Sequence, residues 1–159
     1  MINPQVSILT AREADLPALL ALEETGFEPA ERWSERSWLG EILGDGRRTL
    51  VARTHQVVGA ISLQLMGNSS DLHRLVVAPS ARRQGIGTAL VRAGLDAIRH
   101  LGARSVILEV RIDNDPAIKL YQELGFEQLA ARENYYGPGQ HALILKFWDL
   151  QGPRTGEVT

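Results

Sequence analysis

A short segment at positions 82–88, RRQGIGT, combines residue types that suit the binding of an anion. It opens a predicted helix, and a helix start exposes unpaired N–H groups at the positive end of the helix dipole. Gly85 and Gly87 would let a bulky anion approach the backbone without meeting a Cβ atom. Arg82 and Arg83 add permanent charge and forked donors that suit phosphate.

Two nucleotide-binding motifs that RRQGIGT could represent do not fit it. The dinucleotide fingerprint G-x-G-x-x-G fails at Leu90, and the Walker P-loop fails because no Gly-Lys-Ser/Thr is present. An ordinary helix start with permissive glycines and solvated arginines remains the alternative. Because glycine carries a helix penalty of about 1 kcal/mol relative to alanine, two glycines in one turn favour a functional reason.

The composition limits the classes of protein to which the chain can belong. A chain of 159 residues suits one domain with a sizeable core. Its 17 Lys and Arg against 19 Asp and Glu give a net charge of −2, so we expect neither nucleic acid nor a membrane as a partner. Without cysteine, the chain can have no disulfide, no thiolate metal site and no cysteine nucleophile.

The N-terminal segment and the histidines predict a cytoplasmic protein without a metal. The N-terminus lacks a basic region, and its apolar run VSIL is too short for a signal peptide. No segment approaches the run of about 18 apolar residues that indicates a membrane span. The four histidines are scattered without metal-ligand spacing, so we expect no metal.

Apolar periodicity and turn residues predict strands and helices in the order βααβββαβαββ. Ser34 is the expected cap of the second helix, and Asn114 caps the fourth helix with Pro116 at its first position. The predicted strands are 6–10, 50–53, 57–65, 72–77, 105–110, 126–131 and 142–148, and the predicted helices are 16–26, 35–43, 85–101 and 115–124.

This order predicts an α/β or α+β fold with one strand–helix–strand crossover, from strand 72–77 to strand 105–110. Such a crossover makes the two strands parallel and leaves a ligand crevice at their carboxyl ends, where RRQGIGT lies. We expect a single domain over residues 1–150 and a polar tail over 151–159.

The motif R-x-x-G-x-G at positions 82–87 resembles the acyl-CoA pyrophosphate loop of the GNAT superfamily of acetyltransferases. The preceding LVVAP, the long helix after the loop and the later NDPAIKLYQELGF follow the order of that superfamily. The resemblance covers residues 6–148 and is densest over 72–136. It implies the GNAT fold, with a mixed central sheet of about seven strands flanked by about four helices, and acetyl-CoA as cosubstrate.

Within the superfamily, LEVR at 108–111, RENYY at 132–136 and Trp33 before the second helix resemble the RimI branch. That branch acetylates protein N-termini, best known at the N-terminal alanine of a small-subunit ribosomal protein. Two departures concern the acceptor side. Gln140 and His141 stand where the branch has the acids of Gly-Glu-Asp-Ala, and Arg74 brings a cation to a strand that is more neutral in the branch.

The resemblance implies that Glu109 is the general base and that Tyr121 is the general acid beside the coenzyme sulfur. Because the chain has no cysteine, direct attack in a ternary complex is the expected route. From the residues alone, Glu109 could instead be a solvent-facing strand carboxylate paired with Arg111 or Arg74. Tyr121 could equally be a core aromatic with its hydroxyl at the rim.

The resemblance also implies a set of cosubstrate contacts. Val76 and Val77 would lend their main chain to the pantetheine arm, and Asn114 and Tyr121 would contact it from the other side. Lys119 could reach a nucleotide phosphate or be a solvated helix lysine. The phosphate-binding set is Arg82, Arg83, Gln84, Gly85, Ile86, Gly87 and Thr88. The acceptor set is His73, Arg74, Tyr135 and Tyr136.

We therefore expect an enzyme that moves an acetyl group from acetyl-CoA to the N-terminal α-amino group of a protein, with a ribosomal protein as the implied partner. An α-amino group has a pKa of about 7.7–8.0 against about 10.4 for lysine, so one carboxylate acting through water suffices more easily for an N-terminus. The alternatives are a GNAT enzyme for a small amine or lysine side chain, and a CoA-binding module without catalysis. We expect a monomer or weak dimer.

Overall fold

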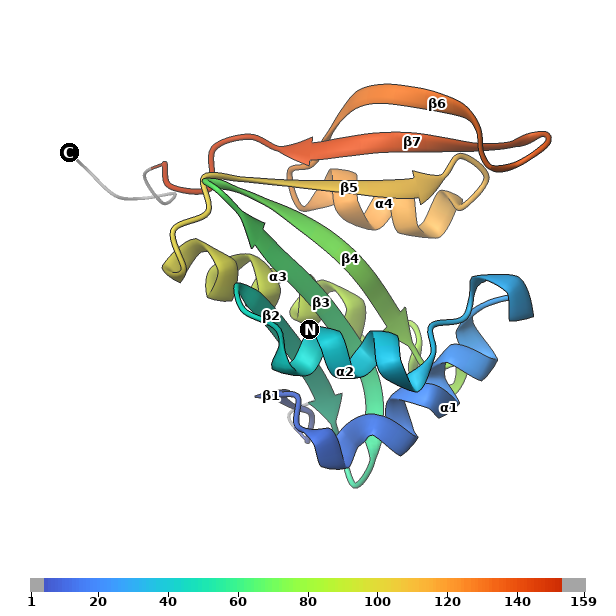
Figure 1. Cartoon of the computed structure of the whole chain (residues 1–159), viewed down its shortest axis with the longest axis vertical. Coiled ribbons are helices and arrows are strands. Elements are labelled where there is room, and N and C mark those ends of the chain that lie inside the picture. Colours follow the sequence, from blue (N-terminus) through green and yellow to red (C-terminus); the bar gives the residue numbers. More distant parts are fainter. Residues whose placement is uncertain (1–4, 153–159) are drawn as a thin grey trace.

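The computed structural model describes residues 5–152 and contains one mixed sheet of seven strands (Figure 1). The strands are ordered β1-β2-β3-β4-β5-β7-β6, and β4–β5 is the parallel pair among antiparallel ones. The predicted order of elements and the parallel crossover are both confirmed. The strands are β1 (Ser7–Thr10), β2 (Arg47–Arg53), β3 (Val57–Met66), β4 (Ser69–Val77), β5 (Ser105–Arg111), β6 (Glu127–Gly137) and β7 (Gln140–Phe147).

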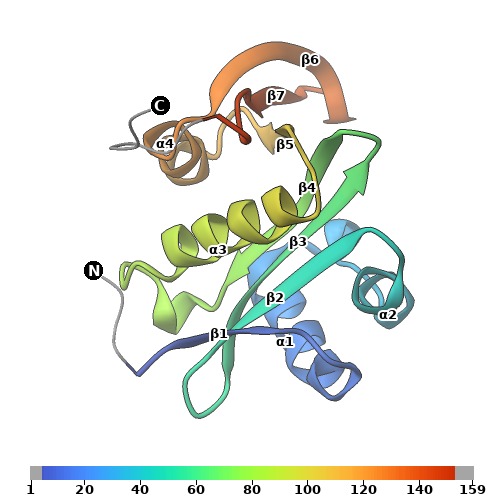
Figure 2. The ribbon, with the colours of Figure 1, turned by 90° about the vertical axis from the view of Figure 1, so that its left-hand side faces the viewer.

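Helices cover both faces of the β1–β4 part of the sheet, with α3 on one face and α1 and α2 on the other (Figure 2). Strand β2 shows how the alternation of side chains serves both layers. Leu50 and Ala52 join the core cluster that includes α3, whereas Val51 joins the cluster of α1 and α2. The helices are α1 (Leu16–Gly26), α2 (Glu35–Leu43), α3 (Ile86–His100) and α4 (Asp115–Glu123).

The two predicted side-chain caps are present. Ser34 Oγ accepts a hydrogen bond from the N–H of Ser37 at 3.1 Å, at the start of α2. Asn114 Oδ1 accepts from the N–H of Ala117 at 3.3 Å, at the start of α4. These caps fix where two helices begin, and α4 begins beside the end of β5.

Strands β4 and β5 separate soon after they begin, as Figure 1 shows. Their register pairs Ser69–Asp71 with Ser105–Ile107, and beyond that point β4 continues to Val77 and β5 to Arg111 without pairing to each other. Backbone groups on the facing edges of both strands are therefore left for other partners. The sheet opens into a cleft at the carboxyl ends of this parallel pair.

A bulge in β4 places two neighbouring side chains on one face of the sheet. In the β3–β4 register Ser62 faces Arg74 and Leu63 faces Leu72, so His73 has no opposite residue. Leu72 packs in the cluster that includes α3, whereas His73 contacts α2 and Arg74 contacts α1. A regular strand would send adjacent side chains to opposite faces, and the extra residue removes that alternation.

Strand β6 is longer than predicted: the sequence indicated 126–131, and the strand runs over Glu127–Gly137. Its register against β7 is irregular between Arg132 and Gly137, and Asn134 has a left-handed φ of 55°. Nearly the whole strand is exposed. An exposed edge strand has no buried face to impose an alternating apolar pattern, so periodicity could not reveal its second half.

Only the first two residues of the predicted tail, 151–159, belong to the described part of the chain, and 153–159 lie outside it. Gln151 uses its side-chain amide to bond the carbonyls of Arg99 and Ala103. The predicted domain boundary stays a prediction. No helix among residues 5–152 is long and apolar enough to span a membrane.

Two helical glycines, one packed against β3 and one with open space beside it, should respond in opposite ways to a larger side chain. A Cβ atom on Gly94 would lie 2.7 Å from Leu63 Cδ1 and 3.1 Å from Ile61 Cδ1, whereas a Cβ on Gly40 in α2 meets nothing within 4 Å. Gly94→Val should lower the free energy of unfolding by about 1–3 kcal/mol through overpacking. Gly40→Ala should raise it by about 0.5–1 kcal/mol. Urea unfolding followed by circular dichroism measures both, and a Gly94→Val protein as stable as the wild type would contradict this packing.

Candidate active site

A cavity of about 580 Å³ lies between the diverging strands β4 and β5. Its wall is completed by the segment between α1 and α2, by the start of α4 and by β6. The predicted site residues that line it are His73, Arg74, Glu109, Asn114, Tyr121, Tyr135 and Tyr136. The structure therefore brings the predicted acid–base pair and the predicted acceptor set around one space. Val76, Val77 and the 82–88 segment do not line it.

Glu109 projects from β5 and is exposed, with Tyr135 as its partner. The Tyr135 hydroxyl donates to Glu109 Oε2 at 2.7 Å, and this hydrogen bond raises the pKa of Tyr135. The alternative partners of Glu109 are engaged elsewhere, because Arg111 pairs with Glu31 and Arg74 pairs with Glu23. One carboxylate oxygen of Glu109 is thus oriented by a phenol at the cavity wall.

Tyr121 of α4 is almost fully buried, with 5% of its surface exposed. Its ring packs edge-on against Phe126 at a centroid distance of 5.5 Å. Burial raises the pKa of Tyr121, because the phenolate would be poorly solvated there. The phenol therefore keeps its proton well above neutral pH. The ring is a core aromatic whose side chain reaches the cavity, and the general-acid role stays a prediction.

The two residues that depart from the RimI pattern, Gln140 and His141, stand at the start of β7, and both accept hydrogen bonds. The N–H of Asn134 donates to His141 Nδ1 at 2.9 Å, which requires His141 to be unprotonated at that nitrogen. Gln140 Oε1 accepts from Arg111 Nη2 at 2.9 Å. Both residues act as hydrogen-bond acceptors without carrying the negative charge of an acid. Neither residue lines the cavity itself.

A buried ion pair fastens the segment between α1 and α2 to β4. The Arg74 guanidinium donates through two nitrogens to Glu23, whose exposed fraction is 1%. It also lies 3.4 Å from the centre of the Phe27 ring and donates to the carbonyl of Glu31. Glu23 in turn accepts from the N–H of Trp33 at 2.7 Å. This pair holds a whole side of the cavity in place.

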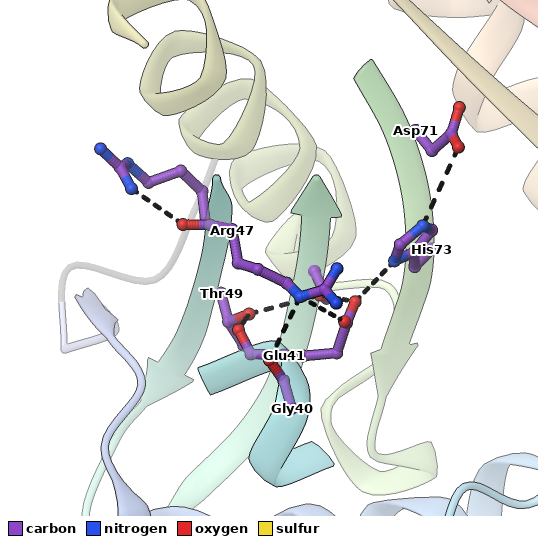
Figure 3. A network of polar contacts seen from close by, with 8 residues as sticks. Gly40, Glu41, Arg47, Thr49, Asp71 and His73 are labelled. Atoms are coloured by element: carbon purple, nitrogen blue, oxygen red, sulfur yellow. Dashed lines mark hydrogen bonds and ion pairs between the residues drawn. The ribbon is translucent and has the colours of Figure 1, made fainter. Parts of the chain in front are cut away.

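A second buried carboxylate, Glu41 of α2, organises a network around β4 (Figure 3). Glu41 accepts hydrogen bonds from His73 Nδ1 and from Ser62 Oγ, each at 2.6 Å. It also forms an ion pair with Arg47, whose Nε lies 3.0 Å from Glu41 Oε2 and donates to the carbonyl of Gly40. Burial would raise the pKa of Glu41, but the hydrogen bonds from His73 and Ser62 and the charges of His73 and Arg47 outweigh it and lower this pKa. Glu41 is therefore ionised at neutral pH.

Sequence reasoning missed Glu23, Glu41 and the cavity residue Asp71. The signal for the two glutamates was a charged residue at an apolar position. Glu23 continues the buried row of Leu16 and Leu19, and Glu41 follows the buried Trp38 by three residues. Burial raises the pKa of Asp71, and the charge of Glu109 across the cleft raises it further, although His73 opposes the effect. No local pattern in the sequence indicates that Asp71 and Glu109 lie close together.

The start of α3 has no side-chain cap. Gly85 occupies the N-cap with a left-handed φ of 77°, so the N–H groups of Ile86, Gly87 and Thr88 have no partner within the helix. Arg83 is exposed and has a φ of 64°. This geometry fits the predicted anion site at RRQGIGT.

Lys119, which could reach a nucleotide phosphate or be a solvated helix lysine, is exposed. Lys119 is 78% exposed in its side chain and lies 4.0 Å from Glu123, as a solvated helix lysine would. Among the residues that the structure describes, no group of three or more metal-ligating side chains could hold a metal ion.

The chain matches the acetyltransferase (GNAT) family over residues 11–126. It is 31% identical over 133 residues to the ribosomal protein bS18-alanine N-acetyltransferase of Escherichia coli, and the matched region covers 82% of this chain and 86% of that protein. It is 42% identical over 103 residues to an N-alpha-acetyltransferase of Sulfurisphaera tokodaii, covering 57% of this chain and 62% of that protein. The crystal structure of the Escherichia coli ribosomal-protein-S18-alanine N-acetyltransferase superposes with a TM-score of 0.82 at 26% identity and covers 97% of this chain and 99% of that one.

The buried ion pair predicts a strong stability effect with a clear control. Arg74→Leu leaves Glu23 buried without its cation, which should lower the free energy of unfolding by about 3–5 kcal/mol. The double variant Arg74→Leu/Glu23→Leu removes both charges and should recover most of that loss. Thermal unfolding by calorimetry measures both proteins. If the single variant melts like the wild type, the pair does not hold the cavity wall as described.

Proposed function

The chain belongs to the GNAT acetyltransferase family and is an acetyl-CoA-dependent N-acetyltransferase, and we propose that its acceptor is the N-terminal α-amino group of a protein. A ribosomal protein that begins with alanine is the acceptor class we favour, because the chain resembles a ribosomal protein bS18-alanine N-acetyltransferase over most of its length. The observation that carries the proposal is that an exposed carboxylate, Glu109, and a buried phenol, Tyr121, line one cavity.

The residues present fit a phosphate-bearing acyl donor. We propose that the unpaired N–H groups at the start of α3, with Arg82 and Arg83, hold the pyrophosphate of acetyl-CoA. We propose that the backbone of Val76 and Val77, beyond the last pair of the β4–β5 register, contacts the pantetheine arm, which would displace the Arg82 Nε that now donates to the Val77 carbonyl. Asn114, which lines the cavity, is the proposed contact from the other side. Acetyl-CoA supplies an acetyl thioester there.

The proposed acid–base roles of Glu109 and Tyr121 follow from their different environments, one exposed and one buried. Glu109, oriented by Tyr135, is the proposed base that takes the proton of the acceptor amine, directly or through water. Tyr121, which keeps its proton because it is buried, is the proposed acid that protonates the leaving thiolate. With no cysteine in the chain, attack of the amine on the thioester in a ternary complex is the proposed route.

The acceptor side has features that suit a cationic amine on an extended peptide. Asp71, Glu109 and Glu31 place three carboxylates around the cavity. Tyr135 and Tyr136 form an edge-on pair with ring centroids 5.0 Å apart on its wall. All of these residues belong to one chain, so we propose that a monomer is active. A cytoplasmic location follows from this proposal, because ribosomal proteins are made there.

Acceptor choice can be tested with the purified protein, acetyl-CoA and matched peptides. A peptide that begins Ala-Arg should be acetylated at its α-amino group, as mass spectrometry of the product would show. The same peptide with a blocked N-terminus and an internal lysine should not react, and neither should small amines. Acetylation confined to the blocked peptide or the small amines would contradict the N-terminal assignment.

The proposed acid and base predict matched losses of turnover. Glu109→Gln and Tyr121→Phe should each lower kcat by about 100-fold or more, because each removes one proton transfer in the transition state. Binding of CoA, measured by calorimetry, should change little in Glu109→Gln. Lys119→Gln, on the solvated face of α4, is the control and should keep the wild-type rate. Near-normal rates in both Glu109→Gln and Tyr121→Phe would contradict the proposed roles of the two residues as base and acid.

A further inference from the structure

His73 stands between two carboxylates of different character (Figure 3). Its Nδ1 lies 2.6 Å from Oε1 of the buried Glu41, and its Nε2 lies 4.0 Å from Oδ2 of Asp71. Asp71 and His73 both line the active-site cavity, whereas Glu41 does not. One nitrogen of the ring is therefore tied to a buried charge, and the other is on the side of the cavity carboxylate.

The buried charge fixes the tautomer of the ring. Glu41 is ionised and only accepts hydrogen bonds, so the proton of neutral His73 is on Nδ1. The lone pair of Nε2 is then free to accept a proton. When it does, the positive ring lies against Glu41 and near Asp71, and both stabilise it. A buried carboxylate that orients an imidazole in this way is the arrangement of a general base.

We propose that His73, oriented by Glu41, is a second proton acceptor of the active site, which takes up the proton that the acceptor amine loses. An N–H bond of the ammonium group breaks and a bond from that proton to His73 Nε2 forms, by way of Asp71 or water. The neutral amine then attacks the thioester carbon, and its second proton passes to Glu109. The C–S bond breaks, the thiolate takes a proton from Tyr121, and the Tyr121 phenolate recovers a proton from Glu109 through water. The imidazolium afterwards releases its proton to solvent.

The surroundings of His73 support this role electrostatically. Glu41 of α2 and Asp71 of β4 are negative, and Glu109 of β5 faces Asp71 across the cleft. The positive charges nearby are already paired, Arg47 of β2 with Glu41 and Arg74 of β4 with Glu23. The His73 ring is therefore placed, by its contacts with Glu41 and Asp71, to receive a proton from the cavity side.

The test compares kcat/KM of the His73→Asn variant with that of the wild type at two pH values. The asparagine amide can still donate to Glu41 in place of Nδ1, so the variant should fold, but it cannot accept a proton. With an Ala-Arg peptide, kcat/KM for the peptide should fall about 10-fold or more at pH 7. At pH 9 the α-amino group, with a pKa of about 7.7–8.0, is already neutral, and the deficit should shrink to about 2-fold. The KM for acetyl-CoA should not change.

Glu41 should act through His73, which a double variant can show. Glu41→Gln should produce a smaller deficit with the same dependence on pH, and His73→Asn/Glu41→Gln should be no slower than His73→Asn alone. His100→Gln is the matched control, since His100 is exposed on α3, where its Nδ1 contacts Asp96. That variant should match the wild type at every pH.

A His73→Asn deficit that is equal at pH 7 and pH 9 would overturn the proposal, because a purely structural defect does not depend on the charge of the acceptor amine. No deficit at either pH would also overturn it. The proposal requires acetyl transfer but not a particular acceptor. If the wild type rejects the Ala-Arg peptide and acetylates a lysine in a blocked peptide, the acceptor assignment has failed, and His73 is tested on that lysine. Because lysine has a pKa of about 10.4, the comparison is then made between pH 9 and about pH 11.5, and the deficit should shrink at the higher pH. A deficit on lysine that is equal at those two pH values would overturn the proposal.

Discussion

The separation of β4 from β5 is the constraint on which the rest of the site depends. Because the pairing of the two parallel strands stops at Asp71 and Ile107, the sheet contains an open wedge instead of a continuous surface. A wedge lined by backbone on both sides leaves polar groups that need partners, and it admits a ligand between strands that would otherwise exclude one. It also sets side chains of β4 opposite those of β5, which is how Asp71 comes to face Glu109.

Two buried glutamates keep the acceptor side of the wedge in one arrangement. The β4 bulge presents two neighbouring basic side chains to one face, where Glu23 binds Arg74 and Glu41 binds His73. Buried charge pairs add little net stability compared with apolar residues of the same shape, because both charges lose their hydration. Their value here is orientation. Each pair ties a residue of β4 to one of the two helices between β1 and β2, so these helices and the β4 side of the cavity wall are positioned together.

Much of this architecture could be predicted from the sequence, and the failures have physical causes. The order of the elements, the caps at Ser34 and Asn114 and the parallel crossover rest on local signals, namely periodicity and turn chemistry. Glu41 and Asp71 could not be assigned locally, because their importance lies in contacts with residues far away in the chain. The second half of β6 escaped prediction because an exposed edge strand carries no periodic pattern.

The central claim is that acetyl transfer takes place in the wedge, with Tyr121 at the leaving sulfur and the start of α3 at the pyrophosphate. A crystal structure of the protein with bound CoA tests this most directly. The account predicts that the pyrophosphate accepts hydrogen bonds from the N–H groups of Gly87 and Thr88, and that the sulfur lies within about 3–4 Å of the Tyr121 hydroxyl. A coenzyme bound with its sulfur outside the β4–β5 wedge, or with its pyrophosphate away from α3, would contradict it.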